Sequence, residues 1–157
     1  MKVGILNVTG YAGSELARIL SNHPEADLVT VTGRSDAGKR LSEVFPHLDA
    51  TDLLITEEIE RSVDIVFSAL SHKASAEASG PLYKSGVKVV DLSADFRLKS
   101  VPEYQEWYNV EHPLPELTEE AVYGLTELHR AEIAVSGLVA NPGCYPTGAI
   151  LALAPAV

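Results

Sequence analysis

Short runs of apolar residues recur along the first hundred residues, and most of them end in small or turn-forming residues. Several runs are apolar at nearly every position, which is typical of parallel strands covered by helices on both faces. The pattern predicts strands over residues 2–6, 27–32, 64–70 and 87–92, and a weaker strand over 52–55.

Segments with helical spacing lie between these runs. Leu16, Ile19 and Leu20 share one helical face after the first strand. Residues 73–86 are rich in Ala, and Gly86 is placed to end that helix. Strands that alternate with helices, joined by right-handed crossovers, predict an α/β fold with a doubly wound, mainly parallel sheet.

The pattern loosens over residues 99–120, which are rich in Pro, Glu and aromatic side chains. Strand-like character resumes over 132–140. A last helix is predicted to begin at Pro146, which suits a first helical position, and to end near Ala154 because Pro155 cannot continue it. We interpret residues 1–157 as one domain.

Composition excludes several classes of protein. The chain has 157 residues, 46% of them hydrophobic, and a formal net charge of −10 without a cluster of Lys or Arg. That charge argues against a nucleic-acid or anionic-membrane partner, and no apolar run approaches the roughly 20 residues that cross a bilayer. A single cysteine excludes an internal disulfide and a cysteine metal cluster, so we expect a cytoplasmic protein without a metal site.

A glycine-containing loop follows the first predicted strand and opens the first helix. Gly10 and Gly13 are spaced like the last two glycines of a dinucleotide fingerprint, and Asn7 stands at the first position, where a residue must tolerate positive φ. Gly10 would admit a pyrophosphate, and Gly13 would let the helix pack on the strand. A tight turn without a ligand is the alternative, but the order of strand, loop and helix favours a Rossmann-type NADP domain. The expected cofactor-binding residues here are Asn7, Thr9, Gly10, Tyr11, Ala12 and Gly13.

The loop after the second predicted strand indicates which dinucleotide is bound. Arg34, Ser35 and Lys39 offer charge-assisted hydrogen bonds to a 2′-phosphate, which favours NADP over NAD. Asp36 points the other way, because a carboxylate there could bind a ribose hydroxyl. Arg34 and Lys39 could also be ordinary solvated charges.

Cys144, the only cysteine, lies between Pro142-Gly143 and Tyr145-Pro146. The N-terminus of the following helix would favour the thiolate and could stabilise an oxyanion on a substrate carbonyl. An inert core cysteine is the alternative. A nucleophilic thiolate near a nicotinamide cofactor indicates acyl chemistry through a thioester.

Five segments in order resemble the N-acetyl-gamma-glutamyl-phosphate reductases of arginine biosynthesis. The resemblance covers nearly the whole chain. The sequence departs from the family pattern at Asn7, and at Ser71-His72-Lys73, where Pro-His-Gly is more usual. The segments are GYAGSEL, GRSDAGK, DLSADFRL, VYGLTELHR and ANPGCYPTGAILAL.

The resemblance implies NADPH-dependent reduction of N-acetyl-glutamyl 5-phosphate to the 5-semialdehyde with release of phosphate. It implies that Cys144 forms the thioester and that Arg97 holds anionic groups of the substrate, although Arg97 could instead form a surface ion pair. Asn141 and Gly143 would shape the nucleophile turn as part of the substrate site. The remaining residues implied near the nicotinamide are Ser68, Ala69 and Leu70.

Members of this family are roughly twice as long, and their catalytic histidine belongs to a second domain. We therefore interpret residues 1–157 as the NADP-binding domain, ending in the nucleophile turn and its helix, of an enzyme that is incomplete and inactive without the second domain. The expected partners are a small acyl phosphate and, in the complete enzyme, further copies of the chain.

Two other functions stay open from the sequence. One is a related reductase that acts on an N-acetyl-aminoadipyl or carrier-linked acyl phosphate in lysine biosynthesis, or more distantly an aspartate-semialdehyde dehydrogenase. The other is a non-catalytic NADPH-binding module with an inert thiol. Among the histidines, His23, His47 and His112 are predicted to lie in exposed loops, whereas the positions of His72 and His129 leave their roles open.

Overall fold

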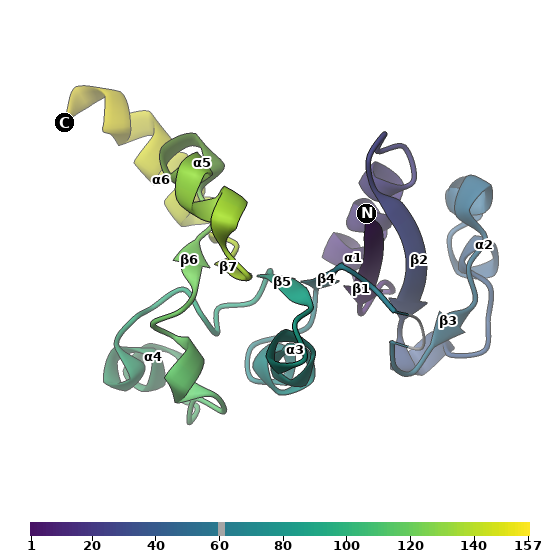
Figure 1. The fold of residues 1–157 in the computed structure, drawn as a ribbon, viewed down its shortest axis with the longest axis horizontal. Coiled ribbons are helices and arrows are strands. Elements are labelled where there is room, and N and C mark those ends of the chain that lie inside the picture. Colours follow the sequence, from purple (N-terminus) through teal and green to yellow (C-terminus); the bar gives the residue numbers. More distant parts are fainter. Residues whose placement is uncertain (60–61) are drawn as a thin grey trace.

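The computed structural model describes residues 1–59 and 62–157, which form one seven-stranded sheet (Figure 1). The strand order is β3-β2-β1-β4-β5-β7-β6, and each pairing of neighbouring strands is parallel. The strands are β1 (Lys2–Leu6), β2 (Asp27–Thr32), β3 (Ile55–Thr56), β4 (Ile65–Ser68), β5 (Lys88–Asp91), β6 (Val122–Tyr123) and β7 (Leu138–Ala140).

Helices cover both faces of the sheet, so the predicted doubly wound, Rossmann-type architecture is confirmed. In Figure 1, α1, α5 and α6 lie on one side of the sheet, and α3 and α4 lie on the other. The helices are α1 (Tyr11–Leu20), α2 (Leu41–Val44), α3 (Ala74–Lys84), α4 (Val101–Tyr108), α5 (Thr126–Val135) and α6 (Cys144–Leu153), with short 3-10 turns over Arg34–Asp36, Pro46–Thr51, Pro115–Leu117 and Ala154–Ala156.

The order of the strands reverses between β1 and β4. From β1 the chain first builds outward through β2 to β3, then returns to place β4 on the other side of β1 and continues to β5 and beyond. In open parallel sheets of this kind, ligands bind in the crevice beyond the carboxyl ends of the strands at such a point.

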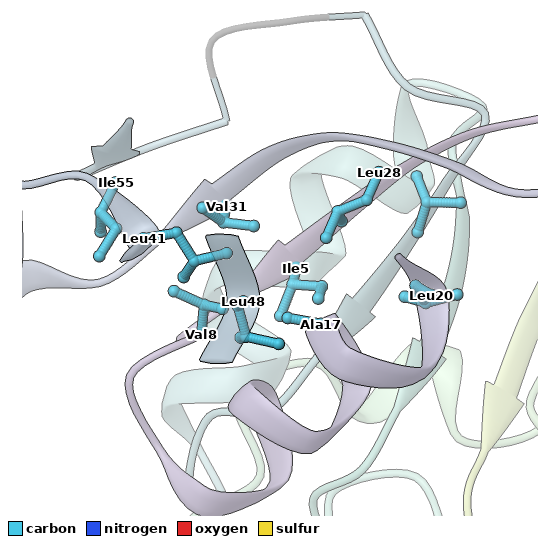
Figure 2. Packing of buried hydrophobic residues seen from close by; sticks show 10 residues of the cluster. Ile5, Val8, Ala17, Leu20, Leu28, Val31, Leu41, Leu48 and Ile55 are labelled. Atoms are coloured by element: carbon cyan, nitrogen blue, oxygen red, sulfur yellow. The ribbon is translucent and has the colours of Figure 1, made fainter. Parts of the chain in front are cut away.

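Alternate side chains of β1 enter different cores because successive residues of a strand face opposite sides of the sheet. Val3 and Ile5 pack with α1 and with residues around α2 (Figure 2), whereas Leu6 packs on the opposite face. Figure 2 shows Ala17 of α1 directly against Ile5. This two-sided burial explains why β1 reads as a nearly continuous apolar run.

Several predicted boundaries need correction. The strands predicted over 2–6 and 27–32 have those bounds, and those predicted over 64–70 and 87–92 are shorter. The strand predicted over 52–55 is misplaced, since β3 is Ile55–Thr56. The strand predicted over 132–140 is wrong in its first half, because Thr126–Val135 is α5; the helix formers Glu127, Leu128 and Arg130 outweigh the later β-branched residues.

The last helix begins at Cys144, two residues before the predicted start. Pro146 therefore lies inside the first helical turn. This costs no intrahelical hydrogen bond, because the N–H groups of the first turn have no intrahelical acceptor.

Candidate active site

The loop between β1 and α1 has the geometry that a dinucleotide cradle requires. Asn7 adopts a φ of 65°, as expected for a residue that replaces the turn glycine. Its side-chain amide donates to the carbonyl of Ala69 at 2.9 Å, which joins this loop to the end of β4. A Cβ on Gly13 would collide with the carbonyl oxygen of Asn7 and lie 2.8 Å from Cα of Val8, so only glycine fits there.

The first turn of α1 leaves its backbone N–H groups free for an anion. Gly10 is the N-cap residue, and no side chain caps the helix. The ring of Tyr11 is 99% exposed. Thr9 contributes a weak hydrogen bond to Asn7 Oδ1 at 3.5 Å, and Ala12 lies exposed in the first turn. Uncapped N–H groups and the helix dipole together favour a phosphate at this point.

A cleft of about 500 Å³ opens beside this loop, at the carboxyl ends of β1 and β2. Four of the predicted cofactor-binding residues line it: Asn7, Arg34, Ser35 and Leu70. The sequence did not predict the other lining residues, because they lie near strand ends or on the first turns of α3, where no motif identifies them. They are Leu6, Thr32, Gly33, Glu57, Ala74, Glu77 and Ala78.

The proposed 2′-phosphate residues do not all face this cleft. Asp36 accepts a hydrogen bond from Ser35 at 3.0 Å and forms an ion pair with Lys39 at 2.8 Å. The hydrogen bond from Lys39 is the main cause that lowers the pKa of Asp36, and the hydrogen bond from Ser35 adds to it. Arg34 and Ser35 line the cleft, whereas Lys39 lies outside the lining and is held by Asp36.

Ser68 and Ala69, at the end of β4, are not among the residues that line this cleft. The side chain of Ser68 is fully buried, and its hydroxyl is 2.6 Å from that of Ser75 on α3. The Ala69 carbonyl accepts the Asn7 amide. Of the three residues implied near the nicotinamide, Leu70 is the one that lines the cleft.

Cys144 lies exposed as the first residue of α6, with Gly143 as the N-cap. The Thr147 N–H and hydroxyl both bond to the Gly143 carbonyl, at 3.0 and 2.9 Å, and fix the turn. The N–H of Asn141 donates to the Asp91 carbonyl at 2.8 Å, so the turn is tied to the end of β5. The thiol therefore stands at the same edge of the sheet as the cleft.

Arg97 lies against this turn. Its Nε donates to the Asn141 carbonyl at 2.8 Å, and one terminal nitrogen donates to the Leu92 carbonyl at 2.7 Å. A Cβ on Gly143 would lie 3.2 Å from the other terminal nitrogen, Nη1. The half-buried guanidinium is thus oriented by backbone carbonyls rather than by an acidic side chain, which leaves its positive charge uncompensated by those contacts.

One histidine prediction is wrong. His112 is only 4% exposed and fills the space between Phe96 and Tyr104, at ring distances of 5.6 and 4.7 Å. Its Nδ1 accepts the Leu114 N–H at 3.1 Å, so Nε2 carries the proton donated to the Asp95 carbonyl at 2.7 Å. His23 and His47 are exposed, as predicted.

In the described part of the chain, no hydrogen bond, ion pair or ring contact joins His72 or His129 to the Cys144 turn. His72 is exposed, with its ring 5.8 Å from Tyr108, and His129 pairs with Glu132 at 3.3 Å. Within residues 1–59 and 62–157, no group of three His, Cys, Asp or Glu side chains is arranged to hold a metal. Over the same residues, no helix has the length and apolar character to cross a membrane.

Comparison with known proteins agrees with this geometry. Residues 2–136 match the family described as semialdehyde dehydrogenase, NAD binding domain. An N-acetyl-gamma-glutamyl-phosphate reductase of Dehalococcoides mccartyi (strain ATCC BAA-2266 / KCTC 15142 / 195) is 63% identical over 99% of this chain, and one of Methanopyrus kandleri is 51% identical over 99%. The chain spans 46% and 47% of the length of these relatives.

Solved structures show the same fold at low identity. The aspartate semialdehyde dehydrogenase II of Vibrio cholerae superposes with a TM-score of 0.72 at 18% identity, over 99% of this chain and 45% of that one. The Candida albicans enzyme, described with NADP, gives 0.66 at 19% identity, over 99% and 46%. From the family match over most of its length, the chain belongs to the semialdehyde dehydrogenase NAD-binding domain family.

Proposed function

We propose that this chain is the nucleotide-binding and nucleophile-bearing part of an N-acetyl-gamma-glutamyl-phosphate reductase. The observation that carries the proposal is the exposed Cys144 at the N-terminus of α6, on the edge of the sheet where the cofactor cleft opens. The names of relatives at 51–63% identity support this substrate over others. The reaction forms an aldehyde from an acyl phosphate.

NADP fits the cleft. Gly13 lets α1 pack closely against the backbone of Asn7 and Val8, and the first turn of α1 is uncapped. Arg34 and Ser35 lie after β2, where the adenosine ribose is expected. We propose that the pyrophosphate lies over Gly10, Tyr11 and Ala12. When bound, NADPH supplies the hydride that reduces the acyl carbon.

Cys144 acts as the nucleophile in this proposal. Its thiolate attacks the acyl carbon, the bond from that carbon to the phosphate oxygen breaks, and inorganic phosphate leaves with the electron pair. After reduction of the thioester carbon, the C–S bond breaks, the aldehyde is released and the thiolate is restored. The N–H groups at the start of α6 favour the negative charge on sulfur and on the carbonyl oxygen.

Arg97 would bind an anionic group of the substrate beside the thiol. Its two bonds to the carbonyls of Leu92 and Asn141 fix the direction of the guanidinium, so binding an anion costs little further ordering. Asn141 and Gly143 shape the turn through their backbone. We also propose that the complete enzyme is a homo-oligomer in the cytoplasm. The location is in keeping with the single cysteine of residues 1–157.

The test uses the full-length protein and measures phosphate-dependent NADP reduction with N-acetyl-glutamate semialdehyde. Cys144→Ala should remove turnover while NADPH binding stays within about two-fold, because no lining residue of the cleft changes. A parallel assay with N-acetyl-aminoadipate semialdehyde separates the lysine-pathway alternative. If wild-type protein binds NADPH, shows no turnover with either substrate and leaves Cys144 slow to alkylate with iodoacetamide, the non-catalytic module is correct instead.

A further inference from the structure

Asp95 lies in the turn after β5, outside the cleft and outside the Cys144 turn. It accepts hydrogen bonds from the start of α3, which lines the cleft, and it is two residues before Arg97, which bonds to the Cys144 turn. Its side chain is fully buried. The carboxylate accepts three hydrogen bonds: from the N–H of Lys73 at 2.8 Å, from the N–H of Ala76 at 2.9 Å and from the hydroxyl of Tyr104 at 2.7 Å. Because these donors come from α3 and α4, the buried carboxylate fixes the turn after β5 against both helices. We call this contact the Asp95 junction.

On the cofactor side, Asp95 supplies a cap that α3 lacks in its own sequence. Lys73 is the N-cap residue of α3 and makes no side-chain cap bond, so the first N–H groups of that helix need an outside acceptor. The same helix turns carry Ala74 and Glu77, which line the cleft. The position of this wall therefore depends on the Asp95 carboxylate.

On the nucleophile side, Asp95 is two residues before Arg97. Its own N–H donates to the Ser93 hydroxyl at 3.1 Å, and the N–H of Arg97 donates to the Ala94 carbonyl at 3.2 Å, so the turn over 93–97 is internally braced. Arg97 then reaches the Asn141 carbonyl. One short segment thus joins the wall of the cleft to the turn that holds Cys144.

Two aromatic neighbours hold this junction from the third side. Tyr104 of α4 is fully buried, and His112 donates from Nε2 to the Asp95 carbonyl at 2.7 Å. Their rings are 4.7 Å apart. Neither ring lines the cleft, so this packing serves to hold Asp95 in place.

We propose that Asp95 is a positioning residue that sets the placement of the nicotinamide end of the cleft relative to Cys144. The proposal rests on the proposed function, since it concerns alignment for hydride transfer. Misplacement of reacting atoms by about 1 Å can cost about 10²-fold in rate, whereas the adenosine end at Arg34 and Ser35 would keep its contacts. Loss of Asp95 should therefore lower kcat far more than it weakens cofactor binding.

The kinetic test uses three variants of the full-length protein. Asp95→Asn keeps the shape but turns one acceptor into a donor that faces an N–H or O–H group, and should lower kcat about ten-fold or more while the Kd for NADPH changes by less than about three-fold. Tyr104→Phe removes one of the three bonds and should lower kcat by a smaller factor. Ser79→Ala is the control, because the buried Ser79 hydroxyl bonds only within α3, to the Ser75 carbonyl, and kcat should not change.

A second measurement on residues 1–157 separates failure of this proposal from failure of the proposed reaction, because it requires no turnover. Amide hydrogen exchange should rise in Tyr104→Phe both near Lys73 and Ala76 and at the hydrogen-bonded N–H groups of Asn141 and Thr147. A cap that acted only on α3 would raise exchange at the first pair alone. Ser79→Ala should leave the second pair unchanged.

Either of two results would overturn the proposal. One is an active wild type whose Tyr104→Phe variant keeps full kcat at temperatures well below its unfolding temperature. This result counts against the proposal even if Asp95→Asn does not fold. The other is exchange that rises at Lys73 and Ala76 but not at Asn141 and Thr147. An inactive wild type refutes the reductase assignment, and the exchange result then decides the structural coupling.

Discussion

At the scale of single residues, Asn7, Lys73 and Asn109 are the non-glycine residues with positive φ in the described part of the chain. Asn7 and Asn109 have φ values of 65° and 52°, in a region that Asn visits readily. Lys73 has φ 67° and ψ −58°, close to the rare and strained γ-turn, and a long side chain there is costly. This is the position where the resembling family more often has Gly.

Lys73→Gly should therefore stabilise the protein. Relief of about 1–3 kcal/mol of backbone strain exceeds the roughly 0.5–1 kcal/mol that glycine costs through the unfolded chain. Urea unfolding should show a higher midpoint with an unchanged slope. Asn109→Gly is the matched control and should gain nothing, because φ 52° and ψ 38° are already accessible to Asn. Equal gains at both sites would contradict the argument from strain.

Arg34 gives a prediction about cofactor choice. It lines the cleft, and a charge-assisted hydrogen bond is worth about 1.5–3 kcal/mol, so Arg34→Ala should weaken NADPH binding about ten-fold or more. NADH binding should hardly change, because NADH has no 2′-phosphate. Titration of both cofactors against wild type and against Lys84→Ala, a distant cation paired with Glu116, checks the effect. Equal losses for both cofactors would refute the phosphate contact.

The sequence predicted single residues correctly where the local backbone conformation alone determines which residue fits. Asn7 was expected at positive φ because the position demands it. The prediction for His112 failed because Phe96 and Tyr104, from earlier segments of the chain, bury its ring, and no motif around the histidine indicates that contact. The engagement of Lys39 by Asp36 was likewise not predicted, since the sequence places both charges in the loop without saying which of them pair.

At the scale of elements, the first two apolar strands, over 2–6 and 27–32, were predicted with their bounds, because burial on both faces leaves a continuous signal. The second half was harder. The strand β6 has two residues and β7 has three, and neither is long enough to show a period. The helix α5 has no buried residue, so its sequence lacks the apolar face that would have identified it.

Gly13 and Gly148 give opposite predictions at this scale. Gly13→Ala would force a Cβ into the backbone of Asn7 and Val8, which cannot move aside cheaply, and should cost about 1–3 kcal/mol or more. Gly148→Ala meets nothing within 4 Å inside α6 and should gain roughly 0.5–1 kcal/mol. Chemical denaturation of residues 1–157 measures both. Destabilisation by Gly148→Ala would contradict the open environment described for it.

At the scale of the whole molecule, one buried acid makes stability depend on pH. Burial raises the pKa of Asp91, and hydrogen bonds from Ser75 and Ser93 offset this only in part. The native state therefore binds this proton more tightly than the unfolded chain, and the associated stability is present below the unfolded pKa of about 3.9 and is lost as pH rises through the native value. The free energy of unfolding of wild type minus that of Asp91→Asn should fall as pH rises above about 4, and a flat or rising difference would contradict this sign.

The surface of α6 leads to a prediction about association. No residue of this helix is buried, although it is apolar on all sides, and Tyr145 and Leu153 are 89% and 62% exposed. Helices of that composition are normally covered, and the relatives of this chain are about twice its length. Residues 1–157 alone should therefore self-associate through α6, while still binding NADPH, because no residue of α6 lines the cleft.

Sedimentation velocity over a range of concentrations tests this association. Leu153→Lys should shift residues 1–157 toward monomer, because it places a charge in the apolar face. Trp107→Lys is the matched control: Trp107 is 74% exposed but lies on α4, on the opposite side of the sheet in Figure 1, and should leave association unchanged. In the full-length protein the same Leu153→Lys change should instead lower the unfolding temperature, because there the charge would be buried against the additional residues. Monomeric wild type at all concentrations, or an equal effect of both variants, would show that α6 is not the associating surface.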